Sequence, residues 1–309
     1  RLSRGLGDVY KRQVYYIKTI IKENKHLKIN YNNLILSAAI GYKWSDLKIF
    51  IKSLRKVSND RVIFIVGKNI EKETVEKFSY YKIGYHIYAD KNLTNIPGLK
   101  NSKSDIGQRR YEMYISILEK LEKKPIKILL TDSRDVVFQS NIFDHSFKRP
   151  LNFFLESEKI MNDPRNVRWL KRTVGQQIFE KIKDNLISCS GTTLGNFDEI
   201  MNYIKLMKKN LYLFPYKRPL RHIISLKKVE PYDQGIHNYL IYSNFFKDVE
   251  CHKNNVSKIC TTAYMKNFRF NKEGQLLNDQ DDIYSVIHQY DRSFYDNGSP
   301  VFNFKKIYE

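Results

Sequence analysis

Short apolar runs that alternate with segments of helical period limit the fold of this chain more than any other sequence feature. Residues 34–40 (LILSAAI) form one such run, closed by Gly41, and residues 62–66 (VIFIV) form the next. Between them, apolar side chains recur every three or four residues from Trp44 to Val57, as on one face of a helix. A short continuous apolar run is typical of a strand buried on both faces in a parallel sheet. The alternation therefore predicts an α/β fold with a doubly wound, mostly parallel sheet.

The same alternation continues along the chain, and neither an internal repeat nor a linker interrupts it. We therefore expect a single domain. Ser45 is placed to cap the first helix, and polar residues 95–106 predict a loop. Further helices are expected over 71–81, 111–121, 197–207 and 232–241, and further strands over 85–88, 126–130, 151–155 and 186–189.

The composition fits a folded chain with a large core. Hydrophobic residues make up 42% of the 309 residues and aromatic residues 14%, which excludes disorder of the whole. No run of about 18 apolar residues occurs, so no membrane span is predicted within this sequence. Three cysteines, an odd number, argue against a disulfide framework, although Cys251 and Cys260 could pair in a secretory protein. We expect a cytoplasmic protein and leave a secretory one open.

The chain is strongly basic, with 54 Lys+Arg against 33 Asp+Glu and a net charge of +21. The basic residues are spread along the chain and no nucleic-acid-binding motif accompanies them. We interpret the charge as a solvated basic surface and expect no nucleic-acid partner. Peripheral attraction to an anionic membrane surface stays open.

The first residues are set apart from the rest. Residues 3–13 (SRGLGDVYKRQ) resemble the translation of a sequencing-library adaptor, and the chain begins with Arg1 instead of Met. We therefore treat residues 1–13 as an artefact and residues 14–32 as a truncated N-terminal segment, whose signal or anchor is undetermined. Residues 33–309 form the expected folded domain.

Two acids follow a predicted buried strand. Asp132 and Asp135, in the sequence TDSRD, come directly after the strand over 126–130. Ligands of open α/β sheets bind outside the carboxyl ends of the strands. Two carboxylates at this spacing can converge on one cation, and oxygen ligands suit Mg²⁺ or Mn²⁺, which also bind substrate phosphates. The alternative is that one of them caps the following turn or helix.

Three further motifs follow in order. Residues 188–195 (SCSGTTLG) predict a small-residue turn between a strand and a helix, where backbone can approach a ligand closely. Residues 231–235 (PYDQG) open a helix with a carboxylate and an amide. Residues 287–292 (IHQYDR) place an imidazole after an apolar strand, with a guanidinium four residues later. Together they offer metal ligands, partners for sugar hydroxyls and a phosphate clamp.

The order of these motifs resembles that of GT-A-fold glycosyltransferases that use nucleotide-sugars. The nearest resemblance is to collagen hydroxylysine glucosyltransferase domains, whose metal motif is also DxxD, and a more distant one is to glycogenin-like enzymes. It spans roughly residues 33–292 and departs from the collagen-type enzymes at Tyr232, where a second acid is expected. The resemblance implies a GT-A-like, Rossmann-like domain over 33–309. It also implies Mn²⁺- or Mg²⁺-dependent transfer of a hexose from a UDP-sugar to a glycan, lipid or protein acceptor, with retention of configuration.

The resemblance implies roles for the motif residues. Asp132, Asp135 and His288 would hold the metal, a buried hydrogen-bonded histidine being the alternative for His288. Arg292 would pair with a phosphate, or lie exposed near the chain end. The residues of the other two motifs would bind the donor sugar or the acceptor, or else form an ordinary turn and a helix cap: Ser190, Gly191 and Thr192 at the donor sugar, and Asp233 and Gln234 at the sugar hydroxyls or acceptor.

Further donor contacts are implied at three places. Arg109 and Arg110 would reach the pyrophosphate or donor sugar, or form a solvated helix start. Glu156 would reach the donor sugar, or end its strand in solvent. The end of the first strand would face the nucleobase, or simply pack in the fold, through Ala38, Ala39, Gly41 and Tyr42.

Three rival classes differ in what they require. A phosphatase of the haloacid dehalogenase type needs a second acid where Arg134 stands. A sugar-1-phosphate nucleotidyltransferase needs a Gly-rich loop with Arg after the first strand, which residues 40–43 (IGYK) do not supply. A basic nucleic-acid-binding protein is supported by charge alone.

Overall fold

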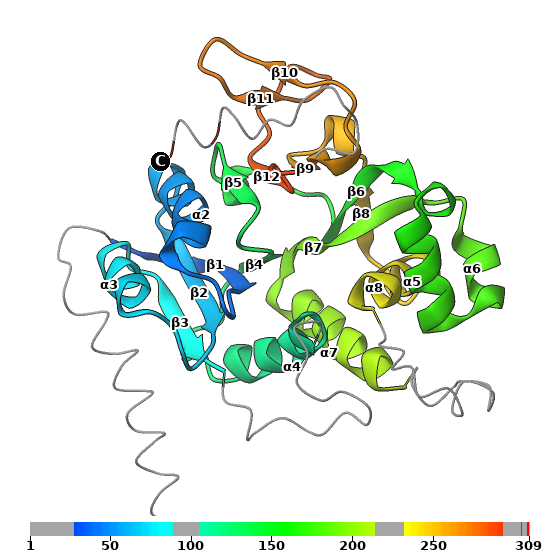
Figure 1. The fold of residues 1–309 in the computed structure, drawn as a ribbon, viewed down its shortest axis with the longest axis horizontal. Coiled ribbons are helices and arrows are strands. Elements are labelled where there is room, and N and C mark those ends of the chain that lie inside the picture. Colours follow the sequence, from blue (N-terminus) through cyan, green and yellow to red (C-terminus); the bar gives the residue numbers. More distant parts are fainter. Residues whose placement is uncertain (1–27, 89–104, 214–231, 293–303, 305–307, 309) are drawn as a thin grey trace, which may run out of the picture.

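The computed structural model describes residues 28–88, 105–213 and 232–292, together with residues 304 and 308. Within these residues the chain is α/β, with a seven-stranded, mostly parallel central sheet and helices on both of its faces (Figure 1). The predicted α/β class is confirmed, and the arrangement is compatible with a Rossmann-like fold. Residues 1–13, most of the 14–32 segment and most of the predicted 95–106 loop lie outside the described residues.

One strand of the central sheet runs against all the others. The order is β3-β2-β1-β4-β7-β6-β8, in which β1 is parallel to both of its neighbours and β7 is antiparallel to both of its own. Because the chain proceeds outward from β1 in one direction and then returns to β4 on its other side, the carboxyl ends of β1 and β4 form a topological switch point. The strands are β1 (Asn30–Ala38), β2 (Asp60–Val66), β3 (Gly84–Ile87), β4 (Lys127–Thr131), β6 (Leu151–Lys159), β7 (Leu186–Asn196) and β8 (Val249–His252).

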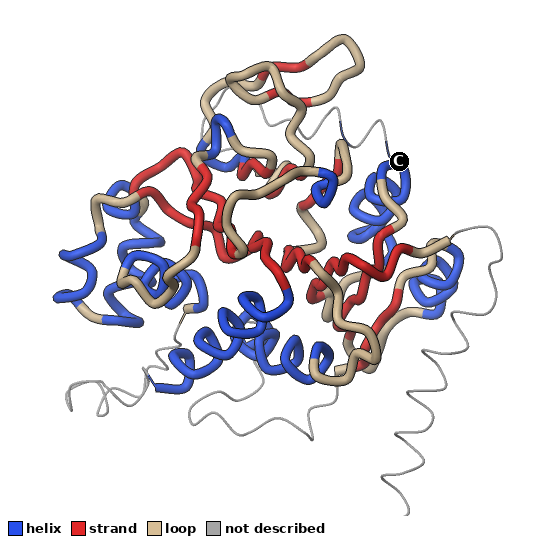
Figure 2. The backbone as a smooth tube through the Cα atoms, turned by 180° about the vertical axis from the view of Figure 1, so that it is seen from behind, coloured by secondary structure: helices blue, strands red, loops and turns tan. Residues whose placement is uncertain are grey.

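Two hydrophobic clusters cover the two faces of this sheet. On β1, Leu34 and Leu36 face the cluster below α4, α7 and α8, whereas Ile35 faces the cluster below α2 and α3. This explains why three consecutive residues of the strand, Leu34 to Leu36, are all apolar. Figure 2 shows the strands passing between helices seen from behind. The helices of the two layers are α2 (Trp44–Val57), α3 (Lys72–Tyr80), α4 (Asp105–Leu118), α7 (Phe197–Leu213) and α8 (Asp233–Tyr242).

A small three-stranded sheet brings β12 (Val286–His288) close to the loop that follows β4. Its order is β5-β12-β9, and β5 directly follows the acidic loop after β4. The helices α5 and α6 lie beside α8 (Figure 1). Within the described ranges, no helix is long and apolar enough to cross a membrane. These elements are β5 (Val136–Phe138), β9 (Ile259–Thr261), β10 (Arg269–Phe270), β11 (Leu276–Leu277), β12 (Val286–His288), α5 (Pro164–Val174) and α6 (Gln176–Ile182).

Two local predictions were wrong. Residues 188–195 form no turn, because they belong to β7 and pair with both β4 and β6. The glycines there permit close approach within the sheet: a Cβ on Gly195 would lie 2.8 Å from the Pro150 carbonyl oxygen. Ser45 is not the helix cap either, since α2 begins after Lys43, whose backbone N–H donates to Asp46 at 2.9 Å.

Candidate metal centre

The loop between β4 and β5 is tied to the switch point by backbone and side-chain hydrogen bonds. The Asp132 N–H donates to the Gly191 carbonyl at 2.9 Å, which extends the pairing of β4 with β7 by one residue. The Ser133 hydroxyl donates to the Ala38 carbonyl, also at 2.9 Å, and so joins the loop to the end of β1. Asp135 immediately precedes β5. Both acids are therefore held by sheet elements outside the carboxyl ends of β1 and β4.

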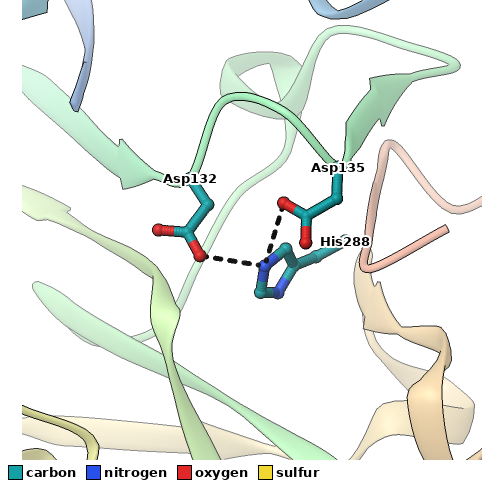
Figure 3. A group of neighbouring side chains, drawn as sticks. All are labelled: Asp132, Asp135 and His288. Atoms are coloured by element: carbon teal, nitrogen blue, oxygen red, sulfur yellow. Dashed lines mark ion pairs between the residues drawn. The ribbon is translucent and has the colours of Figure 1, made fainter. Parts of the chain in front are cut away.

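His288 reaches these acids through strand register. On β12 it lies opposite Val136 of β5, the residue that follows Asp135. Its Nε2 lies 3.3 Å from Asp132 Oδ2 and 3.8 Å from Asp135 Oδ1, and Figure 3 shows the imidazole between the two carboxylates. The His288 side chain is 0% exposed and that of Asp135 3%, whereas that of Asp132 is 38% exposed. The group is thus open to solvent on the Asp132 side.

Each carboxylate divides its two oxygens between an arginine and the centre. Asp132 Oδ1 accepts from Arg110 at 2.8 Å, and Asp135 Oδ2 pairs with Arg292. The other oxygen of each acid faces His288 Nε2, and the three ligand atoms all lie within 4.8 Å of one another. That buried nitrogen faces both carboxylates but makes no hydrogen bond, and a cation between the three atoms would give it a bonded partner. A divalent cation fits this donor set.

Gly191 leaves the space for such a cation. It belongs to β7, and a Cβ built on it would lie 2.8 Å from both Asp132 Oδ2 and His288 Nε2. Real Cβ atoms essentially never come so close, so any side chain here would displace the candidate ligands. This is a specific reason for the glycine in the small-residue motif.

The charges at the centre stabilise one another. Burial opposes ionisation of Asp132, but His288 and Arg110 together hold its pKa well below the usual range. Burial also opposes protonation of His288, yet Cys189, Asp132 and Asp135 raise its pKa well above the usual value. A cation that binds Nε2 would therefore displace a proton from the imidazole.

Arg110, expected at the pyrophosphate, connects the two acidic motifs in this structure. Its side chain is 10% exposed and donates to Asp132 and to Asp233 Oδ2, each at 2.8 Å, and to the Ser190 carbonyl at 3.1 Å. Burial and Asp132 raise the pKa of Asp233, whereas Arg110 lowers it. Arg110 thus joins the start of α8 to the acidic loop after β4.

Gln234 uses its amide to attach α8 to β7. Its Oε1 accepts from the Ser190 N–H at 2.9 Å, and its Nε2 donates to the Ser188 carbonyl at 2.6 Å. Thr192, also on β7, is buried opposite Thr131 of β4. Gln234 therefore fixes the start of α8 to β7, and Thr192 lies inside the sheet.

The residues predicted at the nucleobase differ in exposure. Ala39 is buried in the core, and Gly41 has a φ of +79° in the turn after β1. Tyr42 is half-buried, and its pKa is raised by burial and then by the charges of Asp132 and Asp135. Of this group, Tyr42 is the side chain whose pKa the acids of the candidate metal centre affect.

The last two predicted positions are both buried. Arg109 lies on α4 with 8% of its surface exposed, and Glu156 lies on β6 with 5% exposed. Burial raises the pKa of Glu156 to about 7, against a hydrogen bond from Cys189 that lowers it. Glu156 is therefore not a solvated strand end.

The sequence interpretation assigned no role at the centre to three residues, although all lie inside the quoted motifs: Arg134, Cys189 and Asp291. Arg134 donates to Asp291 at 2.5 Å and lies 3.7 Å from Asp135 Oδ2. Cys189 Sγ lies 3.5 Å from His288 Nδ1. The alternation of Arg and Asp within TDSRD and HQYDR is a signal of this ion-pair network, whereas Cys189 was considered only for disulfides.

Comparison with known proteins found no family model that matches this chain and no match among curated proteins. Two carboxylate oxygens and an imidazole nitrogen are a donor set suited to Mn²⁺ and acceptable to Mg²⁺.

Proposed function

We propose that this protein is a metal-dependent glycosyltransferase of GT-A-like fold that moves a hexose from a nucleotide-sugar, with a UDP-sugar as the expected donor. The proposal is carried by one observation: an oxygen of Asp132 and one of Asp135 converge at the switch point on His288 Nε2, a buried nitrogen that makes no hydrogen bond. Ligands of doubly wound sheets bind at this place. A cation with three protein ligands keeps coordination positions for phosphate oxygens.

In this proposal each group of site residues has its own role. Asp132, Asp135 and His288 hold Mn²⁺ or Mg²⁺, which when bound neutralises the charge that develops on the leaving diphosphate. Tyr42, whose pKa is raised by burial and by the two acids, would lie on the nucleotide side. Asp233, at the start of α8, lies on the acceptor side, where Arg110 fixes one of its oxygens. The acceptor is a glycan, lipid or protein hydroxyl.

The arrangement of Arg134 argues against the phosphatase alternative. That chemistry requires a second carboxyl group two residues after Asp132, where a guanidinium stands and pairs with Asp291 and Asp135. The same guanidinium lies next to Asp135 of the candidate metal centre, where a diphosphate would bind. A guanidinium can bind the phosphates of a nucleotide-sugar donor, but it cannot replace the second acid that the phosphatase reaction requires.

A direct test of the metal site compares two isosteric substitutions. Asp135→Asn removes a candidate ligand. Asp248→Asn is the control, because it removes an acid just before β8 that forms an exposed ion pair with Arg149. Free Mn²⁺, measured by electron paramagnetic resonance, should show an affinity at least about tenfold weaker for Asp135→Asn and unchanged for Asp248→Asn. Equal affinities in the two variants would remove the metal assignment.

A further inference from the structure

The second ring nitrogen of His288 has a buried partner of its own. Cys189 Sγ lies 3.5 Å from Nδ1, on the side of the ring away from the carboxylates. The imidazole is 0% exposed, so bulk water does not reach it. A neutral imidazole that gives its Nε2 lone pair to a cation must carry its proton on Nδ1, and that N–H needs an acceptor. The sulfur of Cys189 is in position to be that acceptor.

A buried carboxyl group lies on the strand next to Cys189. Glu156 of β6 is 5% exposed and follows Leu155, which pairs with Ser188, the residue before Cys189. A thiol has one proton to donate and lone pairs with which to accept. If the S–H points to Glu156, the lone pairs of the sulfur remain for the Nδ1–H of His288. The hydrogen bonds then run in one direction, from His288 through Cys189 to Glu156.

A second contact fixes the same sulfur from the chain segment that carries the histidine. Gln289 Nε2 donates to Cys189 Sγ at 3.9 Å, and this residue has a φ of +58°, in the left-handed region. The Thr262 hydroxyl holds that conformation by donating to the Gln289 carbonyl at 2.6 Å. Strained backbone of this kind persists where the surroundings hold it, and it clusters at functional sites.

We propose that Cys189 and Glu156 are positioning residues that hold His288 in the tautomer with its proton on Nδ1, so that the Nε2 lone pair faces Asp132 and Asp135. This inference rests on the proposed metal site and adds to it the residues that orient its nitrogen ligand. Neither residue touches the cation or the substrate in this account.

The first test measures Mn²⁺ affinity in three variants by electron paramagnetic resonance. Cys189→Ala removes the acceptor and should weaken binding by about tenfold to a hundredfold, the usual effect of removing such a partner. Cys189→Ser keeps a group that both donates and accepts, so it should retain most of the affinity. Cys260→Ala removes a buried thiol from the core of the small sheet and should leave affinity unchanged. Equal affinity in Cys189→Ala and Cys260→Ala would overturn the proposal.

The second test needs no variant. In protein labelled with ¹⁵N-histidine, with diamagnetic Zn²⁺ as the probe, the ring-nitrogen shifts of His288 should show a protonated Nδ1 and a metal-bound Nε2. A proton on Nε2, or coordination through Nδ1, would overturn the proposal even if Cys189→Ala failed to fold. Wild-type protein that binds no Mn²⁺ would instead contradict the proposed function itself, so the two failures are distinguishable.

Discussion

At Asp132 and Asp135 the arginine neighbours limit the charge that a cation meets. Arg110 and Arg292 each neutralise one oxygen, and Arg134 adds a third positive charge next to Asp135. With Asp233 and Asp291 included, the network has one more acid than arginines. A bare divalent cation therefore finds little net negative charge, and a bound diphosphate would supply what is missing.

This charge balance predicts that metal and nucleotide bind cooperatively. UDP should strengthen Mn²⁺ binding by about tenfold, within the usual range of coupling between two sites, and Mn²⁺ should strengthen UDP binding by the same factor. Isothermal titration of each ligand in the presence and absence of the other measures both factors. Mn²⁺ binding that is unaffected by saturating UDP would contradict the placement of the diphosphate at this centre.

Gly191 gives a prediction about space alone. Gly191→Ala places a methyl group 2.8 Å from Asp132 Oδ2 and His288 Nε2, so the ligands must move apart. We expect Mn²⁺ affinity to fall by more than about tenfold, with a cost in stability of about 1–3 kcal/mol from overpacking. The matched control is Gly67→Ala, whose new Cβ would make an ordinary 3.5 Å contact with Ile40. If both variants bind Mn²⁺ like the wild type, the cation does not lie against β7.

At the scale of elements, the sequence predicted the helices and strands whose formation depends on the local spacing of apolar residues. The apolar run ending near Ala38 and the periodic segment starting at Trp44 became β1 and α2 because burial on two faces and on one face leave different spacings. The motif at 188–195 was misread because glycine and serine usually indicate turns. Its glycines are instead required by close contacts with residues distant in sequence, such as His288, and a local sequence window does not contain those residues.

The pairing that completes the candidate centre could not be read from local pattern either. His288 lies next to Asp135 because β12 pairs with β5, and strand register between such distant segments is set by the whole fold. Its expected role came from the motif order and the family resemblance. Cys189 and Arg134 were present in the quoted motifs, but their partners depend on that same pairing.

The contact of α8 with β7 predicts a pH dependence of stability. Buried His237 on α8 lies 2.9 Å from the Ser188 hydroxyl and 2.8 Å from that of Tyr203. Burial and then the charge of Arg110 lower its pKa from 6.5 to about 3. Between these values the unfolded chain binds a proton that the folded protein does not. Stability is therefore complete above about pH 6.5 and falls as pH decreases toward 3, by up to about 1.4 kcal/mol per pH unit from this group.

Chemical denaturation across that pH range measures the effect. The free energy of unfolding of His237→Gln should depend less steeply on pH than that of the wild type, because the group that titrates is gone. The difference between the two slopes isolates His237 from the other histidines. Parallel slopes would show that His237 is not buried in its neutral form.

At the scale of the whole molecule, residues distant in sequence meet at one edge of the sheet. The loop after β4 carries two candidate ligands, β12 carries the third, and Arg292, further along the chain, pairs with Asp135. The α/β class and the single central sheet follow from the order of elements. The antiparallel insertion of β7 between β4 and β6 does not, because an apolar strand reads the same in either direction.

The stereochemistry of transfer depends on whether a free carboxylate lies near the acceptor hydroxyl. Inverting enzymes need a free carboxylate base near the acceptor hydroxyl. Asp233, the acid on the proposed acceptor side, is engaged by Arg110. We therefore expect retention, with an α-linked product from an α-linked UDP-sugar. The coupling constant of the anomeric proton in the product decides this, and a β-linked product would make Asp233 the general base.

The central claim is that Asp132, Asp135 and His288 hold a cation that activates a nucleotide-sugar. The most direct measurement is a donor screen of purified protein, which follows hydrolysis of UDP-, GDP- and CMP-sugars with Mn²⁺ and with EDTA. We predict that a UDP-sugar is hydrolysed only with Mn²⁺, and that Asp135→Asn reduces the rate by at least about a hundredfold while Asp248→Asn does not. Turnover that persists in EDTA and is equal in Asp135→Asn and wild type would contradict the account.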